Sequence, residues 1–79
     1  MFINKTKDNL NNLCGRNIAR LRVELNISQR VLADRLQIIG LDIDKNTIQR
    51  IEAGKRFVTD IELKVIADFF KIDINELLK

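Results

Sequence analysis

The sequence of 79 residues has no histidine, proline, tryptophan or tyrosine and only one cysteine. A single thiol without histidine excludes an internal disulfide, a structural zinc site and histidine-based catalysis. No nucleophile stands beside a base, and no glycine-rich loop could cradle a phosphate. An enzyme is therefore the weakest functional class, and we expect no cofactor, metal or small-molecule ligand.

Long apolar runs are missing as well. No run exceeds three residues, far short of the roughly 20 needed to span a bilayer. The first residues also lack the apolar core of a signal peptide. We therefore expect a cytoplasmic protein with no membrane contact.

The residues that are present have a globular composition, with 46% hydrophobic and 32% charged residues. The length allows about one compact domain with a small core. The net charge of +3 is unevenly distributed, because residues 1–56 hold 11 basic and 6 acidic residues whereas residues 57–79 hold 3 and 5. Affinity for a polyanion should therefore reside in the first two-thirds of the chain.

Apolar residues recur at spacings of three and four, and no stretch alternates with period two, which predicts an all-α fold. Each helix start after the first has an oxygen-bearing N-cap residue that follows an apolar residue. Two of the caps are followed by Glu62 and Glu76 at the third helical position, which predicts capping boxes. The predicted helices cover residues 14–26, 28–39, 45–53, 60–70 and 74–78.

The predicted domain covers residues 14–79, and residues 1–13 form an N-terminal extension whose role the sequence leaves open. Leu10, Leu13 and Cys14 could lengthen the first helix. Phe2 and Ile3 could instead fold back onto the core. Cys14 is expected to be a small buried hydrophobic residue.

The segment from Thr47 to Arg56 is the most informative in the chain. Ile48 and Ile51 form a narrow apolar stripe, and Gly54 is expected to end the helix in a left-handed conformation. An α-helix fits the major groove of B-DNA, where Arg and Lys suit guanine while Asn and Gln suit adenine. The outward positions expected to read bases are Lys45, Asn46, Gln49 and Arg50.

Several short motifs resemble the helix-turn-helix family of phage Cro and C1 repressors and bacterial XRE-type regulators. They are Ser28-Gln29, Leu32-Ala33 with Leu36, Ile48 with Ile51-Glu52-Ala53-Gly54-Lys55, and Asp73-x-x-Glu76-Leu77-Leu78. The resemblance covers roughly Gly15 to Leu78 and implies a compact five-helix, lambda-repressor-like DNA-binding domain. The chain departs from the family in a longer connection before the third helix, around residues 37–43. We expect this surplus to lengthen the second helix and widen the turn.

Contacts to the DNA backbone are expected at the start of the second helix, where free amide groups and the helix dipole attract phosphate. The resemblance implies that Gln29 clamps the backbone there. Cations after Gly54 should hold phosphates without reading sequence. The full set of predicted phosphate contacts is Ser28, Gln29, Arg30, Thr47, Lys55 and Arg56. Arg16, Arg20 and Arg22 on the first helix are expected to be solvated.

These features predict a sequence-specific regulator of transcription that binds double-stranded DNA, most simply a repressor. One helix reads only a few base pairs, so we expect a homodimer on a palindromic operator. The predicted dimer interface consists of Phe70, Ile74, Leu77 and Leu78. The alternative is a small helical protein-interaction module, such as an antitoxin-like or co-regulator subunit. Salt-dependent and sequence-selective affinity for duplex DNA would distinguish the two.

Overall fold

The computed structural model describes residues 5–79, and within this range the chain is all-α. The prediction of five helices is confirmed, and each predicted boundary lies within two residues of the observed one. The helices are α1 (Gly15–Glu24), α2 (Gln29–Ile38), α3 (Lys45–Glu52), α4 (Asp60–Phe70) and α5 (Ile74–Leu77).

The predicted N-caps form at the starts of all four helices that follow α1. The side chains of Ser28, Asp44 and Thr59 each accept a hydrogen bond from the backbone amide three residues on. Thr59 and Glu62 complete the expected capping box.

The second predicted capping box, at Asp73 and Glu76, is wrong. Helix α5 has only four residues, and the Asp73 carboxylate accepts from the amide of Asn75, two residues on. The Glu76 carboxylate lies instead 3.0 Å from the ammonium of Lys79. Only Asp73 of these two acidic residues therefore caps the short helix α5.

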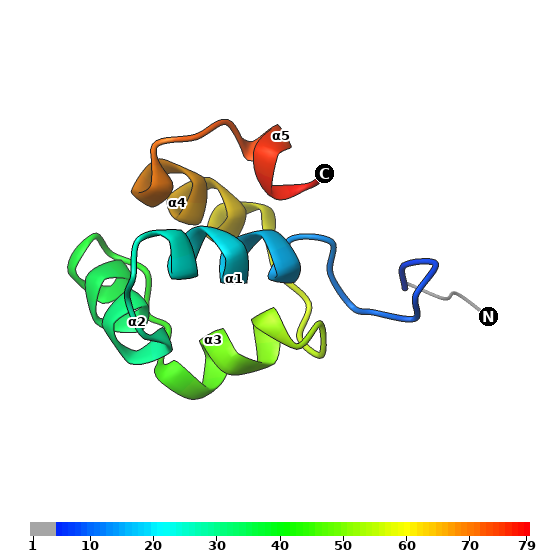
Figure 1. Ribbon diagram of the computed structural model, residues 1–79, viewed down its shortest axis with the longest axis horizontal. Coiled ribbons are helices and arrows are strands. Elements are labelled where there is room, and N and C mark those ends of the chain that lie inside the picture. The colour runs from blue at the N-terminus through cyan, green and yellow to red at the C-terminus, as the bar shows by residue number, and fades with distance from the viewer. Residues whose placement is uncertain (1–4) are drawn as a thin grey trace.

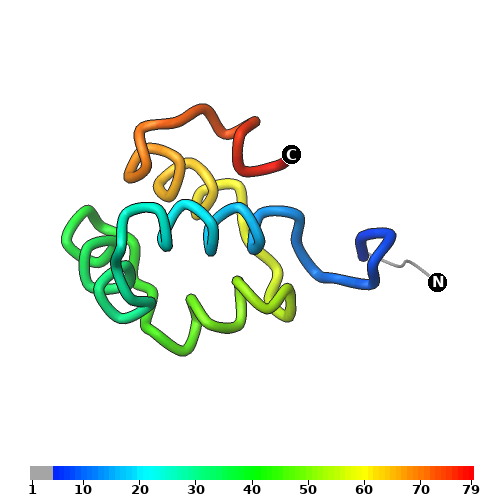
Figure 2. The backbone as a smooth tube through the Cα atoms, viewed as in Figure 1, coloured from blue at the N-terminus to red at the C-terminus, as the bar shows by residue number. Residues whose placement is uncertain are grey.

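Helix α1 crosses the centre of the domain, with α3 on one side of it and α4 and α5 on the other (Figure 1). Helices α2 and α3 pack against each other. Helix α2 also contacts α4, and helix α3 also contacts α1. The tube view shows the chain passing from α2 into α3 at one end of the domain and the N-terminal segment leaving at the opposite end (Figure 2). One side of helix α3 therefore packs against α1 and α2, and its opposite side is exposed.

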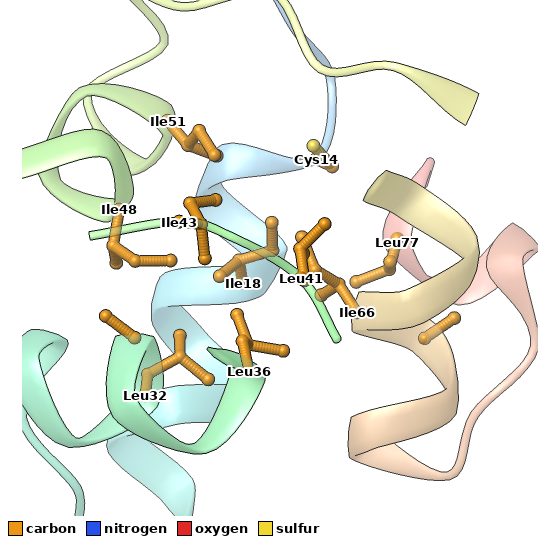
Figure 3. Close-up of a cluster of buried hydrophobic side chains, with 12 residues drawn as sticks. Cys14, Ile18, Leu32, Leu36, Leu41, Ile43, Ile48, Ile51, Ile66 and Leu77 are labelled. Atoms are coloured by element: carbon orange, nitrogen blue, oxygen red, sulfur yellow. The ribbon is translucent and has the colours of Figure 1, made fainter. Parts of the chain in front are cut away.

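The core gathers residues from every helix and from the connection between α2 and α3 (Figure 3). Ile18 of α1, Ile66 of α4 and Leu77 of α5 are completely buried. Ile48 and Ile51 of α3 are also completely buried, as the apolar stripe predicted. Burying a side chain of this size contributes about 1.5–3 kcal/mol, so these two residues hold α3 in place.

The surplus residues between α2 and α3 form an ordered connection. Helix α2 continues to Ile38 and the turn follows at Gly40, whose φ of 101° is accessible mainly to glycine. Leu41 and Ile43 are then buried in the core, and the Gln37 amide donates to the carbonyl of Ile43 at 2.8 Å. The connection between α2 and α3 thus adds two residues to the core.

Cys14 lies just before α1 and is 1% exposed, which confirms its prediction as a buried small residue. Burial raises the pKa of its thiol to about 11, so the thiol stays protonated and unreactive near neutral pH. Leu10 and Leu13 lie outside α1, and Leu13 is 58% exposed. Phe2 and Ile3, which could have folded onto the core, are outside the described residues. In the described range, no helix has the length and apolar content of a membrane span.

Gly15, the first residue of α1, provides a test of this packing. A Cβ atom at Gly15 would lie 2.2 Å from the carbonyl oxygen of Ile51. Because that oxygen belongs to the backbone of α3, Gly15→Ala should force α1 and α3 apart and lower the free energy of unfolding by about 1–3 kcal/mol or more. Urea unfolding followed by circular dichroism measures the change. The control Arg16→Ala, at the exposed next position, should stay within about 0.5 kcal/mol of wild type; equal losses in both variants would contradict the close-packing interpretation.

Candidate nucleic-acid interface

The free face of α3 carries the four side chains that were expected to read bases. Lys45, Asn46, Gln49 and Arg50 are all exposed, on the side of the helix opposite the buried Ile48 and Ile51. This separation follows from the sequence, because residues three and four apart share a face of an α-helix. The face offers two cations and two amides, which together can donate to guanine and form paired hydrogen bonds with adenine.

The start of α3 is fixed by its cap. The Asp44 carboxylate accepts from both the amide and the hydroxyl of Thr47, each at 2.8 Å. These hydrogen bonds hold the pKa of Asp44 below its ordinary value, so the cap persists to lower pH than an isolated carboxylate would allow. The Thr47 hydroxyl, a predicted phosphate contact, therefore already donates to Asp44.

Helix α3 ends at Glu52 with Ala53 as its C-cap, and Gly54 follows with a φ of 76°, the left-handed conformation that its predicted role requires. A shallow hollow on this side is lined by Asn46, Gln49, Arg50, Ala53 and Lys55. The exposed Lys55 thus borders the same surface as the predicted base-reading residues. Its position beyond the helix suits an edge contact to phosphate rather than base reading.

The start of α2 brings three more predicted residues to this region. The Ser28 oxygen caps the helix by accepting from the amide of Val31 at 3.1 Å. Arg30 is exposed, whereas Gln29 is partly buried and its amide donates to the Glu52 carboxylate of α3 at 3.0 Å. Gln29 is therefore oriented by the neighbouring helix and is not a freely moving surface residue.

Glu52 also forms a two-pronged ion pair with Arg22 of α1. The Nε and Nη2 atoms of Arg22 donate to the two Glu52 oxygens at 2.7 and 3.1 Å, and its Nη1 donates to the carbonyl of Ile27 at 2.9 Å. The side chains are 16% and 8% exposed. The hydrogen bond to Glu52 raises the pKa of Arg22, which remains a cation at any physiological pH. One carboxylate thus connects α1, the start of α2 and α3.

The expectation that Arg22 is solvated is therefore wrong, because its guanidinium turns inward to the carboxylate. Arg16 and Arg20 are exposed and pair with Asp8 and Glu24 at the surface. The available signal for the buried pair was Glu52 itself, the single carboxylate in α3. A single carboxylate on an otherwise cationic helix indicates a partner elsewhere in the chain, because a buried charge has to be paired.

Arg56, the other cation predicted to hold phosphate, is engaged within the domain. Its two terminal nitrogens donate to the two oxygens of Glu62 at 3.0 Å each. Burial alone would raise the pKa of Glu62, but the hydrogen bonds from Arg56 and Thr59 lower it below its ordinary value. The Glu62 charge offsets that of Arg56, so Lys55 is the stronger of the two candidates for a phosphate contact.

Comparison with known proteins gives the family. A family model described as "Helix-turn-helix" matches residues 18–77, which is most of the chain. No curated protein and no solved structure matches the chain. The chain belongs to the helix-turn-helix family of Cro/C1-type, XRE-like transcription regulators, as its motifs suggested. This family binds double-stranded DNA, and the protein is a DNA-binding helix-turn-helix regulator.

The Arg22–Glu52 pair can be tested by a double-mutant cycle with Arg22→Met, Glu52→Met and the double variant. Each single change leaves a partly buried charge without its partner, whereas the double change removes both charges. We expect a coupling energy of about 1–3 kcal/mol in urea unfolding. The matched control is the exposed pair Lys64 and Asp68, where coupling should be below about 0.5 kcal/mol. Equal coupling in the two cycles would show that Glu52 does not hold the helices together.

Proposed function

We propose that this protein is a sequence-specific repressor that covers an operator as a homodimer. The observation that carries the proposal is the exposed face of α3, where Lys45, Asn46, Gln49 and Arg50 stand together on a helix held rigidly by its buried face. Because the buried face fixes the helix before binding, only the four exposed side chains have to be ordered when they meet base edges. Such a face suits selection among sequences.

Phosphate contacts would surround this face. Ser28, Gln29 and Arg30 lie at the N-terminus of α2, where the helix dipole and unpaired amides favour a phosphate. Lys55 lies just beyond the C-terminal end of α3, beside its exposed face. Phosphate contacts from these two segments would set the depth and register of α3 in the major groove, and α3 itself would read the bases.

The base-reading role is tested with Arg50→Ala and Asn46→Ala, after a preferred site has been selected from a random pool of duplexes. Each change should weaken binding to that site by about 1–3 kcal/mol and leave binding to random duplex nearly unchanged, because base contacts exist only on the correct sequence. Titrations of both duplexes at one salt concentration measure the difference. The control Lys64→Ala, on α4, should alter neither. Equal losses on both duplexes would reassign the two residues as phosphate contacts.

Lys55→Ala should weaken binding to all sequences alike and reduce the slope of log affinity against log salt by about one unit. Arg56→Ala should reduce the slope less, because Glu62 already offsets its charge. The slopes come from titrations at several salt concentrations. A larger effect of Arg56→Ala would mean that Arg56 leaves Glu62 to bind phosphate.

A dimer would place two copies of α3 on one operator. Of the residues proposed for its interface, Leu77 is completely buried and belongs to the core of its own domain. Leu78 is 38% exposed, and Phe70 and Ile74 are partly buried. We therefore retain Phe70, Ile74 and Leu78 as the proposed interface, with Leu78 as its most accessible member.

The dimer is tested with Leu78→Glu. The introduced charge should give a monomer at micromolar concentration, keep the helical circular dichroism and weaken binding to a full site more than to a half site. Analytical ultracentrifugation measures the mass. Ile38→Glu is the matched control, since Ile38 is 82% exposed at the end of α2, and it should remain dimeric. If the wild type is monomeric, or if only Ile38→Glu dissociates, the proposed interface is wrong.

One observation favours the alternative of a protein-interaction module. Ile39 lines a surface hollow with Val65, Asp68 and Phe69 of α4, and this surface does not include the exposed face of α3. Exposed apolar side chains around a hollow can mark a site that binds a protein. The two functions are separated by duplex DNA titration, because an interaction module without DNA function would show weak affinity that does not depend on sequence.

A further inference from the structure

The residues before α1 form a small closed loop. The Thr6 amide donates to the carbonyl of Leu10 at 2.8 Å, and the Leu10 amide donates to the Thr6 hydroxyl at 3.0 Å. Asn9 adopts a left-handed conformation with a φ of 64°, which Asn tolerates better than most residues. Residues 6–10 therefore have a defined shape although they form no helix.

Two asparagines attach this loop to the end of α3. The Asn11 amide nitrogens, of backbone and side chain, donate to the carbonyls of Gly54 and Lys55 at 2.8 and 2.9 Å. The Asn12 side chain donates to the carbonyls of Ile51 and Arg56 at 3.1 and 2.8 Å. The N-terminal segment thus satisfies backbone carbonyls where α3 ends, which fixes the loop to the same element that carries the base-reading face.

An apolar contact strengthens the attachment. Leu10 packs against Gly54 so closely that a Cβ atom on Gly54 would lie 2.8 Å from the Leu10 Cδ2 atom. Gly54 is therefore required for two reasons, its left-handed backbone and the approach of Leu10.

The attached loop carries unpaired positive charge. Lys5 and Lys7 are exposed and form no ion pair with any residue of the described range, whereas Asp8 is paired with Arg16 at 3.2 Å. Figure 1 shows this segment running past the C-terminal end of α3, away from the helices. Lys55 connects the two regions, since its side chain borders the base-reading face and its carbonyl accepts from Asn11.

We propose that the loop of residues 5–10 is a second DNA-contacting element, in which Lys5 and Lys7 bind phosphates beyond the end of α3. This inference rests on the proposed function. Lysine ammonium groups are mobile point charges that hold phosphate without reading bases. The loop therefore lengthens the contacted stretch of duplex and adds affinity on every sequence. The hydrogen bonds of Asn11 and Asn12 fix its direction relative to α3.

The test compares Lys5→Ala/Lys7→Ala with a control of equal net charge, Lys64→Ala/Lys71→Asn, in the full chain. Asparagine is chosen at Lys71 because that residue has a φ of 58°. Salt titrations on the selected duplex should show the slope of log affinity against log salt reduced by about two units in the first variant, since each lost phosphate contact removes about 0.9. The control should keep a slope within about half a unit of wild type, because its lysines lie on and after α4.

Ethylation interference then locates the contacts. Phosphates at one end of the half site should weaken wild-type binding when ethylated and lose this effect in Lys5→Ala/Lys7→Ala. Equal slope reductions in the two double variants, or identical interference patterns in the loop variant and wild type, would overturn the inference. A wild-type chain that does not bind duplex DNA would instead overturn the proposed function, so the two failures are distinguishable.

Discussion

Helix α3 has eight residues, and isolated helices of this length are unstable in water. It exists because Ile48 and Ile51 are buried in the core and because Asp44 caps its first turn. Those two isoleucines also decide which side of α3 faces outward. The exposed polar face of α3, which we propose reads bases, is therefore a direct consequence of burying one narrow stripe in a small core.

Polar contacts with neighbouring segments, in addition to the core, hold α3 in place. Glu52 accepts hydrogen bonds from Arg22 and Gln29, which fixes α3 against α1 and against the start of α2. At the end of α3, Asn12 donates to two backbone carbonyls and its own oxygen accepts from the amide of Gly15, the first residue of α1. The C-terminal end of α3 is thus held by side chains from α1, from α2 and from the segment before α1, whereas its N-terminal end is held by the Asp44 cap.

The connection between α2 and α3 contributes to the core as well as joining the two helices. Leu41 and Ile43 enter the core, and Gln37 bonds the carbonyl of Ile43. These residues therefore add apolar burial, which offsets part of the entropy cost of ordering the connection. Helix α3 still packs on α1 and α2 with its polar face outward.

The sequence by itself determined the five helices and the outward face of α3, because caps and apolar spacing act within a few residues of each other. It also placed Cys14 in the core. Tertiary structure alone decided that Arg22 faces Glu52, 30 residues away, that Asn12 reaches Arg56, 44 residues away, and that Leu77 is part of the core. These contacts join segments far apart in the chain, and no local propensity encodes which distant partner a polar side chain will meet.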